Sequence, residues 1–279
     1  MPDKNIIVLI YDFDGTLSPL PMQEYTVLPE LGIKPDDFWS DVGKEVQKTG
    51  GEDIITYMRM MYERAEEKKV HIDRDKLKDM GRRVEYFEGV EDWFSNIRSY
   101  IKERSGDQVE TRHYIISAGL KEILEGVSIF HNFENVFASE YFFDHHNRAT
   151  YPKRVITDTT KTQYLFRINK GVEDLTKSIN SHMSMKDRPI PFENMIYYGD
   201  GLTDVPSMAV TRANGGHSVA VYTPGKSEKI CQTLFNEKRC DFFAPADYGK
   251  GSDLHRRTQL ILDKIIAGIL LQKELDTLG

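Results

Sequence analysis

The chain has 279 residues, 39% of them hydrophobic and 29% charged, which is an ordinary globular composition with room for one large core, or for a core and a smaller second unit. The formal net charge is −7 and there is no basic block, so we expect no nucleic-acid partner. No apolar stretch is long enough to span a bilayer and the first residues lack a signal-peptide layout, which predicts a cytoplasmic protein without membrane contact.

The first predicted strand is the apolar run at residues 6–11, and residues 12–16 follow it with the order Asp-Phe-Asp-Gly-Thr. In open α/β sheets, ligands bind beyond the carboxyl ends of the strands. Asp12 and Asp14 are two residues apart, so their carboxylates project to one side if the extended conformation continues. Paired carboxylates need a cation, and the expected one is Mg²⁺, a hard ion that takes oxygen ligands. An ordinary acidic turn is the alternative.

Residues 18–86 lack strand-like runs and carry charged residues at helical spacing. Asp residues at or near the starts and a Gly-Gly break after the first segment predict helices at residues 36–48, 53–68 and 73–84. We therefore expect a helical insertion, after which the core resumes near residue 87.

Further short apolar runs occur at residues 113–116, 135–138, 195–198 and 218–222. Helix-like segments lie between several of them. Strands that alternate with helices predict an α/β fold with a doubly wound, Rossmann-like parallel sheet. The predicted division is a core of residues 1–17 and 87–279 with an inserted α-helical domain of residues 18–86.

Ser117 follows the predicted strand at 113–116 and precedes Ala118 and Gly119. There a hydroxyl and nearby backbone N–H groups, including that of Gly119, can donate to phosphate oxygens. A helix cap or a plain turn is the alternative.

Two lysines compete for an anion-binding role. Lys161 stands at the expected start of a helix, where a cation opposes the helix dipole unless an anion lies nearby. Lys170 precedes Gly171 at the end of that helix, where a cation is expected for capping alone. We therefore favour Lys161, with a solvated lysine as the alternative for each.

Asp200 and Asp204 lie four residues apart in a glycine-bearing turn after the strand at 195–198. Together with the first acidic pair they indicate a shared Mg²⁺ site, although an isolated acidic loop would have the same composition. Two other features have simpler interpretations. Asp144, His145 and His146 are adjacent residues of an expected hairpin rather than a metal cluster, and Cys231 and Cys240 are expected to be reduced thiols.

Taken in order, these motifs resemble those of the haloacid dehalogenase-like (HAD) hydrolase superfamily, in its phosphatase branch. The resemblance covers residues 6–222 and rests on four motifs: residues 12–16, Ser117, Lys161 and residues 199–204. It implies that Asp12 is the nucleophile that becomes phosphorylated and that Asp14 is the general acid and base. It also implies that the helical insertion is a cap that closes over the site and selects substrates.

The resemblance further implies a ligand set for each part of the site. Mg²⁺ would be held by the Asp12 carboxylate, the backbone carbonyl of Asp14, Asp200 and, directly or through water, Asp204. Ser117, Gly119 and Lys161 would bind the phosphoryl oxygens.

The resulting interpretation is a Mg²⁺-dependent phosphatase that acts through an aspartyl-phosphate on a small phosphorylated metabolite. Within the family, the chain is most similar to phosphoserine phosphatases. It departs from them at residues 19–21, Pro-Leu-Pro, where a substrate-reading acid is expected, and Glu24 is a displaced candidate for that acid. The alternatives are a phosphotransferase or phosphomutase with the same intermediate, and a non-catalytic phosphate-ligand-binding module. Substrate identity and oligomeric state are left open by the sequence.

Overall fold

A seven-stranded sheet forms the centre of the molecule in the computed structural model, which describes residues 4–278. Residues 1–3, part of the segment on which the signal-peptide expectation rests, lie outside the described residues. The strand order is β4-β3-β2-β1-β5-β6-β7, and all neighbours are parallel except β3 and β4. The strands are β1 (Ile6–Tyr11), β2 (Glu110–Leu120), β3 (Asn135–Phe143), β4 (Ala149–Arg154), β5 (Met195–Gly199), β6 (His217–Tyr222) and β7 (Phe242–Pro245). The predicted doubly wound α/β fold is confirmed.

Strand β1 is central because both of its faces are apolar. All six of its residues are buried, and it pairs with β2 on one side and β5 on the other. Its last residue, Tyr11, lies level with Ile115 and Tyr198 on those neighbours. The chain after Tyr11 therefore emerges between the carboxyl ends of two parallel strands, where side chains from all three can meet.

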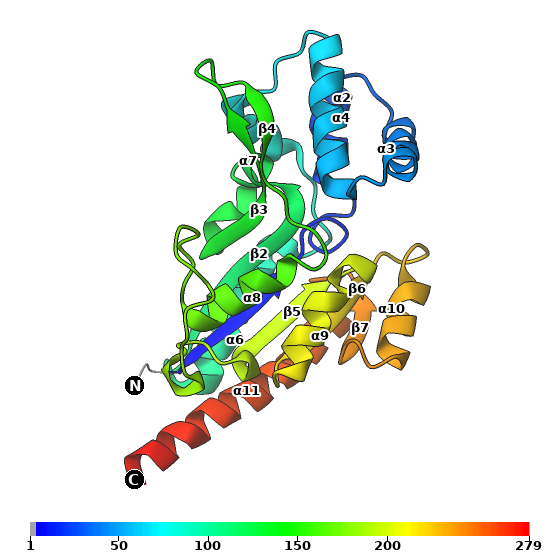
Figure 1. The fold of residues 1–279 in the computed structure, drawn as a ribbon. Helices are drawn as coiled ribbons and strands as arrows, with labels where there is room; N and C mark the ends of the chain where they lie inside the picture. Colours follow the sequence, from blue (N-terminus) through cyan, green and yellow to red (C-terminus); the bar gives the residue numbers. More distant parts are fainter. Residues whose placement is uncertain (1–3, 279) are drawn as a thin grey trace.

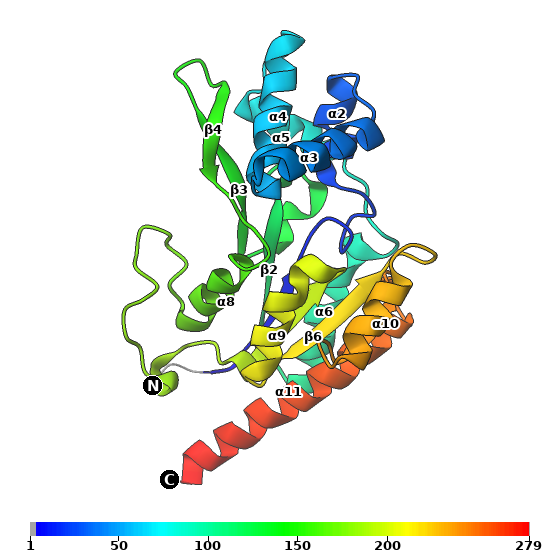
Figure 2. The same cartoon turned by 45° about the vertical axis from the view of Figure 1, so that its right-hand side comes forward.

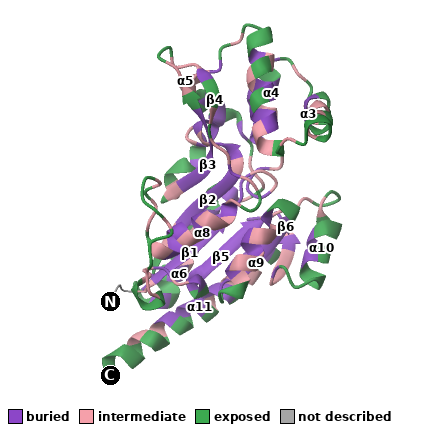
Figure 3. Ribbon diagram, in the orientation of Figure 1, coloured by how far each residue is buried: buried purple, intermediate pink, exposed green. Residues whose placement is uncertain are grey.

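Helices cover both faces of the sheet, whose central strands β1 and β5 are buried along their whole length, whereas the edge strand β4 is largely exposed (Figures 1 and 3). One face packs against α6 (Val90–Ser105) and α11 (Asp253–Leu278), and the other against α8 (Lys161–Lys170), α9 (Val205–Ala213) and α10 (Glu228–Asn236). Helix α11 is buried as far as Ile269, whereas Leu271, Leu275 and Leu278 are exposed on its projecting end. Within residues 4–278, no helix combines the length and apolarity needed to cross a membrane.

Short and medium helices gather above the carboxyl ends of the strands (Figure 1). They are α1 (Met22–Tyr25), α2 (Val27–Glu30), α3 (Pro35–Thr49), α4 (Asp53–Glu67) and α5 (Arg74–Met80). The helix expected at 73–84 is too long, because α5 ends at Met80 and a 3₁₀ turn, Gly81–Arg83, follows. A Cβ at Gly81 would lie 2.2 Å from the carbonyl oxygen of Ile123, so the chain approaches α7 (Lys121–Leu124) closely there. The division at residues 18–86 stays a prediction, and we call these helices the cap.

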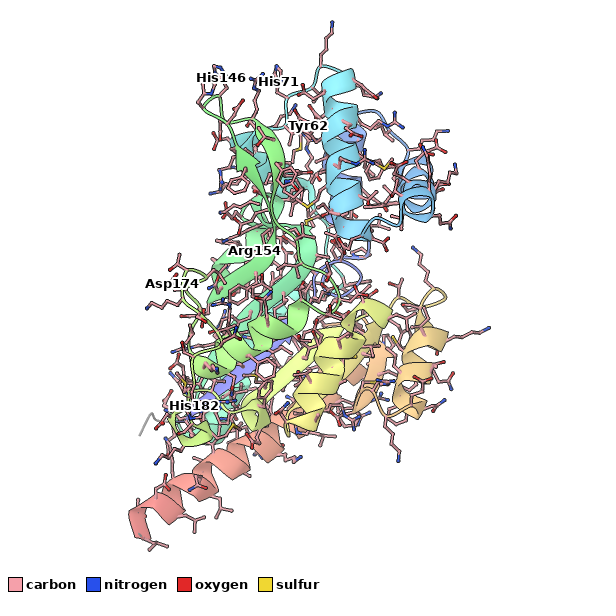
Figure 4. The ribbon with its side chains drawn as sticks, viewed as in Figure 1. Tyr62, His71, His146, Arg154, Asp174 and His182 are labelled. Atoms are coloured by element: carbon pink, nitrogen blue, oxygen red, sulfur yellow. The ribbon has the colours of Figure 1, made fainter. Side chains whose placement is uncertain are left out.

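The β3–β4 hairpin extends from the sheet edge to the cap (Figure 2). The Ala149 N–H donates to the Ile72 carbonyl oxygen at 2.7 Å, and the Asn147 amide donates to the Asp75 carboxylate at 3.0 Å. In Figure 4, His146 lies at the far tip of this hairpin and Tyr62 lies on α4 opposite it. The expected hairpin is confirmed. The rings of His145 and His146 lie 3.9 Å apart, and within residues 4–278 neither joins a group of metal-ligand type.

Candidate active site

Asp12 and Asp14 lie on either side of the point where the first strand ends. The Asp12 N–H still donates to the Tyr198 carbonyl oxygen at 2.9 Å, which continues the pairing of β1 with β5. The chain then turns at Gly15, whose φ is +78°. One oxygen of the Asp14 carboxylate accepts the Met22 N–H of α1 at 2.9 Å. The turn and this bond thus direct Asp14 toward the cap, and the expectation that its carboxylate shares a cation with Asp12 stays a prediction.

The Asp12 carboxylate converges with two carboxylates from the second acidic segment. Oxygens of Asp12, Asp200 and Asp204 lie within 4.8 Å of one another. Glycines make this approach possible, since a Cβ at Gly15 would lie 2.2 Å from Asp200 Oδ2 and a Cβ at Gly199 would lie 2.4 Å from Asp204 Cγ. The pairing of the two acidic segments that the sequence indicates is therefore present in the structure.

Asp204 is the fully buried anchor of this group. Its Oδ1 accepts hydrogen bonds from the Tyr197 hydroxyl and from Lys161 Nζ, each at 2.7 Å. Its Oδ2 accepts the Asp200 N–H at 3.1 Å. Both oxygens are thus engaged by protein donors, which suits Asp204 to hold its neighbours in place and to bind a cation through water.

Lys161 supplies the positive charge at the site. It is the first residue of α8, is 1% exposed, and places Nζ 3.0 Å from Asp12 Oδ1 as well as against Asp204. Lys170 lies at the other end of the helix, where its Nζ donates to the carbonyl oxygens of Ile179 and Ser181. The structure therefore brings Lys161, and not Lys170, to the acidic group.

Burial dominates the electrostatics. It raises the pKa of Asp12 to about 6, and together with the charge of Asp204 it raises the pKa of Asp200 to about 8. Burial and the Asp12 charge also raise the pKa of Asp14 well above its ordinary range. Burial alone would lower the pKa of Lys161, but Asp12 and Asp204 raise it well above its usual value. One lysine does not neutralise so many carboxylates, and three convergent carboxylates are the hard oxygen donors that fit Mg²⁺.

Ser117 and Gly119 lie inside β2, which continues to Leu120, rather than after a strand that ends at 116. The Gly119 N–H donates to Ser117 Oγ at 3.0 Å, and the pairing of β2 with β3 shifts register between Ile116 and Leu120. At this point the bond within β2 takes the place of regular backbone pairing with β3. A sequence pattern does not reveal such a change. The Ser117 hydroxyl proton remains able to donate.

Two cap residues hold the same segment. The Tyr57 hydroxyl of α4 donates to the Ala118 carbonyl oxygen at 3.0 Å, and the Leu120 N–H points at the Met22 sulfur at 3.2 Å. Met22 also fills the space beside Gly119, where a Cβ would lie 2.1 Å from its terminal methyl. Sequence reasoning missed Met22 and Tyr197 as site residues, because their partners lie elsewhere in the chain and no motif marks them.

Comparison with known proteins adds a family and a fold. The family model described as haloacid dehalogenase-like hydrolase matches residues 9–209. A Borreliella burgdorferi protein, described only as uncharacterized, is 30% identical over 297 aligned positions that cover 95% of this chain and 99% of its own.

Solved structures show the same fold. A HAD family hydrolase from Salmonella enterica serovar Typhi has a TM-score of 0.55 at 17% identity, covering 82% of this chain and 66% of its own length. A phosphoserine phosphatase solved as a phospho-aspartyl intermediate analogue has a TM-score of 0.53 at 16% identity, covering 92% of this chain and 99% of its own.

Proposed function

This chain belongs to the haloacid dehalogenase-like hydrolase family, and on that basis we propose that it is a Mg²⁺-dependent phosphatase of a small phosphorylated metabolite that acts through an aspartyl-phosphate. One observation carries the proposal: Lys161 Nζ lies between Asp12 and Asp204 within a buried group of carboxylates at the carboxyl ends of β1 and β5. A nucleophilic carboxylate, a fixed cation and oxygen ligands for a metal are the parts that phosphoryl transfer needs.

The residues present fit Mg²⁺. Asp12, Asp200 and the backbone carbonyl of Asp14 would hold the ion, and Asp204 would bind it directly or through water. When bound, Mg²⁺ supplies charge neutralisation for the transferring phosphoryl group and for the acids around it.

Asp12 and Asp14 divide the chemistry. One oxygen of Asp12 attacks phosphorus, the bond from phosphorus to the ester oxygen breaks, and protonated Asp14 gives its proton to the leaving oxygen. Asp14 then takes a proton from water as that water attacks the aspartyl-phosphate, which releases phosphate and restores Asp12. A raised pKa suits Asp14 to hold the proton that this sequence requires.

Ser117 and Lys161 bind the phosphoryl oxygens in this proposal, and the Gly119 N–H, for which the same role was expected, orients the Ser117 hydroxyl. Ser117 Oγ already accepts the Gly119 N–H, so its own proton is available for a phosphate oxygen. Lys161 Nζ lies on the Asp12 carboxylate that attacks, where it offsets the charge that develops.

The test is Mg²⁺-dependent phosphate release from a panel of phosphomonoesters. We expect turnover that is abolished by chelator and by Asp12→Asn, whereas Asp37→Asn, which removes an exposed acid at the start of α3, retains it. Absence of release by folded, Mg²⁺-binding protein from every ester would refute the proposal. Transfer to an added alcohol in preference to water would instead identify a phosphotransferase.

A further inference from the structure

Two segments of the chain join the cap to the core, residues 17–21 before α1 and residues 84–89 before α6, and we call them the hinge. They are bonded to each other, because the Phe87 N–H donates to the Leu17 carbonyl oxygen at 3.0 Å. A third segment, the loop of residues 246–252 between β7 and α11, holds both ends of the hinge.

Tyr248 makes the bonds between this loop and the hinge. Its hydroxyl donates to the carbonyl oxygen of Thr16, directly before the first segment, at 2.7 Å. Its N–H donates to the carbonyl oxygen of Glu88, in the second segment, at 2.8 Å. At Gly89, whose φ is +80°, a Cβ would lie 2.4 Å from the Gly249 nitrogen, so the two backbones approach closely there. Tyr248 thus holds the chain both where it leaves for the cap and where it returns.

Tyr248 is itself fixed in place. Its side chain is fully buried, and its ring packs edge to face on Trp93 of α6, with the ring centroids 5.1 Å apart. Trp93 Nε1 donates in turn to the Tyr11 hydroxyl at 2.9 Å, which joins this packing to β1. Within the loop, the Asp247 carboxylate accepts the Gly249 N–H at 2.9 Å. Burial raises the pKa of Tyr248 well above its ordinary value, so the hydroxyl keeps the proton that it donates.

The Thr16 carbonyl belongs to the turn that carries the proposed general acid. The N–H groups of Thr16 and Leu17 both donate to the Phe13 carbonyl oxygen, at 3.2 Å and 2.8 Å. These bonds close a turn with Asp14 in its middle, and Tyr248 bonds the closing end of that turn to the core. Without this bond, a movement of the cap would be passed along the chain to Asp14, and general acid catalysis depends on close placement of the acid.

We propose that Tyr248 is a positioning residue, which fastens the hinge to the core so that Asp14 keeps its place for proton transfer when the cap moves. Bending is then confined to residues 18–21 and 84–87, between the held ends and the cap helices. This inference rests on the proposed phosphatase function and adds to it a residue that lies outside all four motifs.

The experiment compares phenyl phosphate with p-nitrophenyl phosphate, whose leaving group is less basic and depends less on a proton from Asp14. Tyr248→Phe keeps the ring and removes the bond to the Thr16 carbonyl. We expect it to lower kcat/KM by about tenfold for phenyl phosphate and by less than about threefold for p-nitrophenyl phosphate. Tyr114→Phe is the matched control, because Tyr114 is also fully buried and its hydroxyl donates to Glu173, outside the hinge, at 2.7 Å. Equal losses for the two esters, no loss, or the same selective loss in Tyr114→Phe would overturn the inference.

Hydrogen exchange, measured by mass spectrometry without substrate, separates this inference from the phosphatase proposal. We expect Tyr248→Phe to exchange faster at residues 13–18 and 84–89, where the amides of Leu17 and Phe87 are hydrogen-bonded. Tyr114→Phe should match the parent protein there, with circular dichroism confirming that both variants are folded. If the parent protein leaves both esters intact but exchange rises as expected, the phosphatase proposal is wrong and the hold of Tyr248 on the hinge stands. If the esters are hydrolysed but exchange at both segments is unchanged, the inference is wrong and the phosphatase proposal stands.

Discussion

Replacement of Glu122 by glutamine should change how the stability of the protein depends on pH. Glu122 belongs to α7, directly after the Ser117–Leu120 segment, and is 1% exposed. Its Oε1 accepts the Tyr141 N–H at 3.1 Å, while Oε2 has no hydrogen-bond partner in the described structure. Burial raises the pKa of this carboxyl from 4.5 to about 7.

The sign follows from proton linkage. The folded protein keeps the Glu122 proton to a higher pH than the unfolded chain does, so the stabilisation is present below pH 4.5 and is lost as the pH rises toward 7. Between pH 5 and pH 8, this one group should lower the free energy of unfolding by about 2.5 kcal/mol. A glutamine does not titrate, yet its amide oxygen can still accept the Tyr141 N–H.

Urea unfolding of the two proteins at pH 5, 6, 7 and 8 measures this effect. We expect the free energy of unfolding of Glu122→Gln, relative to that of the parent protein, to rise by about 2.5 kcal/mol from pH 5 to pH 8. Most of this rise should be complete by pH 7. Glu125→Gln, a partly exposed site directly after the same helix, is the matched control and should run parallel to the parent. Parallel curves for Glu122→Gln would refute the assignment of a raised pKa to this residue.

Three further substitutions test the active site. Lys161→Met leaves Asp12 and Asp204 without their buried cation, so we expect phosphate release to be lost and urea unfolding at pH 8 to show a destabilisation of about 3–5 kcal/mol. A rate and a free energy of unfolding close to those of the parent protein would contradict the pairing. Tyr57→Phe keeps the ring but removes the bond to the Ala118 carbonyl, so steady-state kinetics should show a raised KM for phosphomonoesters, and an unchanged KM would show that this bond does not position the segment. Gly15 has a positive φ, and Gly15→Ala places a methyl group against the Asp200 carboxylate. We therefore expect the variant to need more Mg²⁺ for its half-maximal rate, and an unchanged Mg²⁺ titration curve would contradict a metal role for Asp200.

Local patterns predicted much of the fold and part of the site. The strand at residues 6–11, the turn after it and the alternation of strands and helices all follow from apolar runs and turn residues, and each is present in the structure. The meeting of the two acidic segments was predictable because parallel strands end at one edge of the sheet. Lys161 was predictable because its place at the start of α8 is unfavourable without a nearby anion.

Contacts between distant residues were not predictable. Tyr57 and Ala118 are 61 residues apart, and Met22 and Leu120 are 98 apart, so no local pattern pairs them. The extension of β2 through Ser117 depends on such contacts, as does the end of α5 at Met80, which is set by the approach of Gly81 to Ile123. The direction of the Asp14 carboxylate depends likewise on its bond to the Met22 N–H.

The β3–β4 hairpin has a consequence for how ligands reach the active site. Its bonds to Ile72 and Asp75 fasten the α5 side of the cap to the edge of the sheet, in addition to the two chain crossings between cap and core. Figure 1 shows α3 and the start of α4 on the opposite side, toward α10 and away from the hairpin. Helix α4 is also bonded to the sheet, because the Tyr57 hydroxyl donates to the Ala118 carbonyl oxygen and the Tyr141 hydroxyl donates to the Met58 carbonyl oxygen. We therefore expect the cap to open on the α3 side, with substrate and phosphate exchanging there whichever ester is bound.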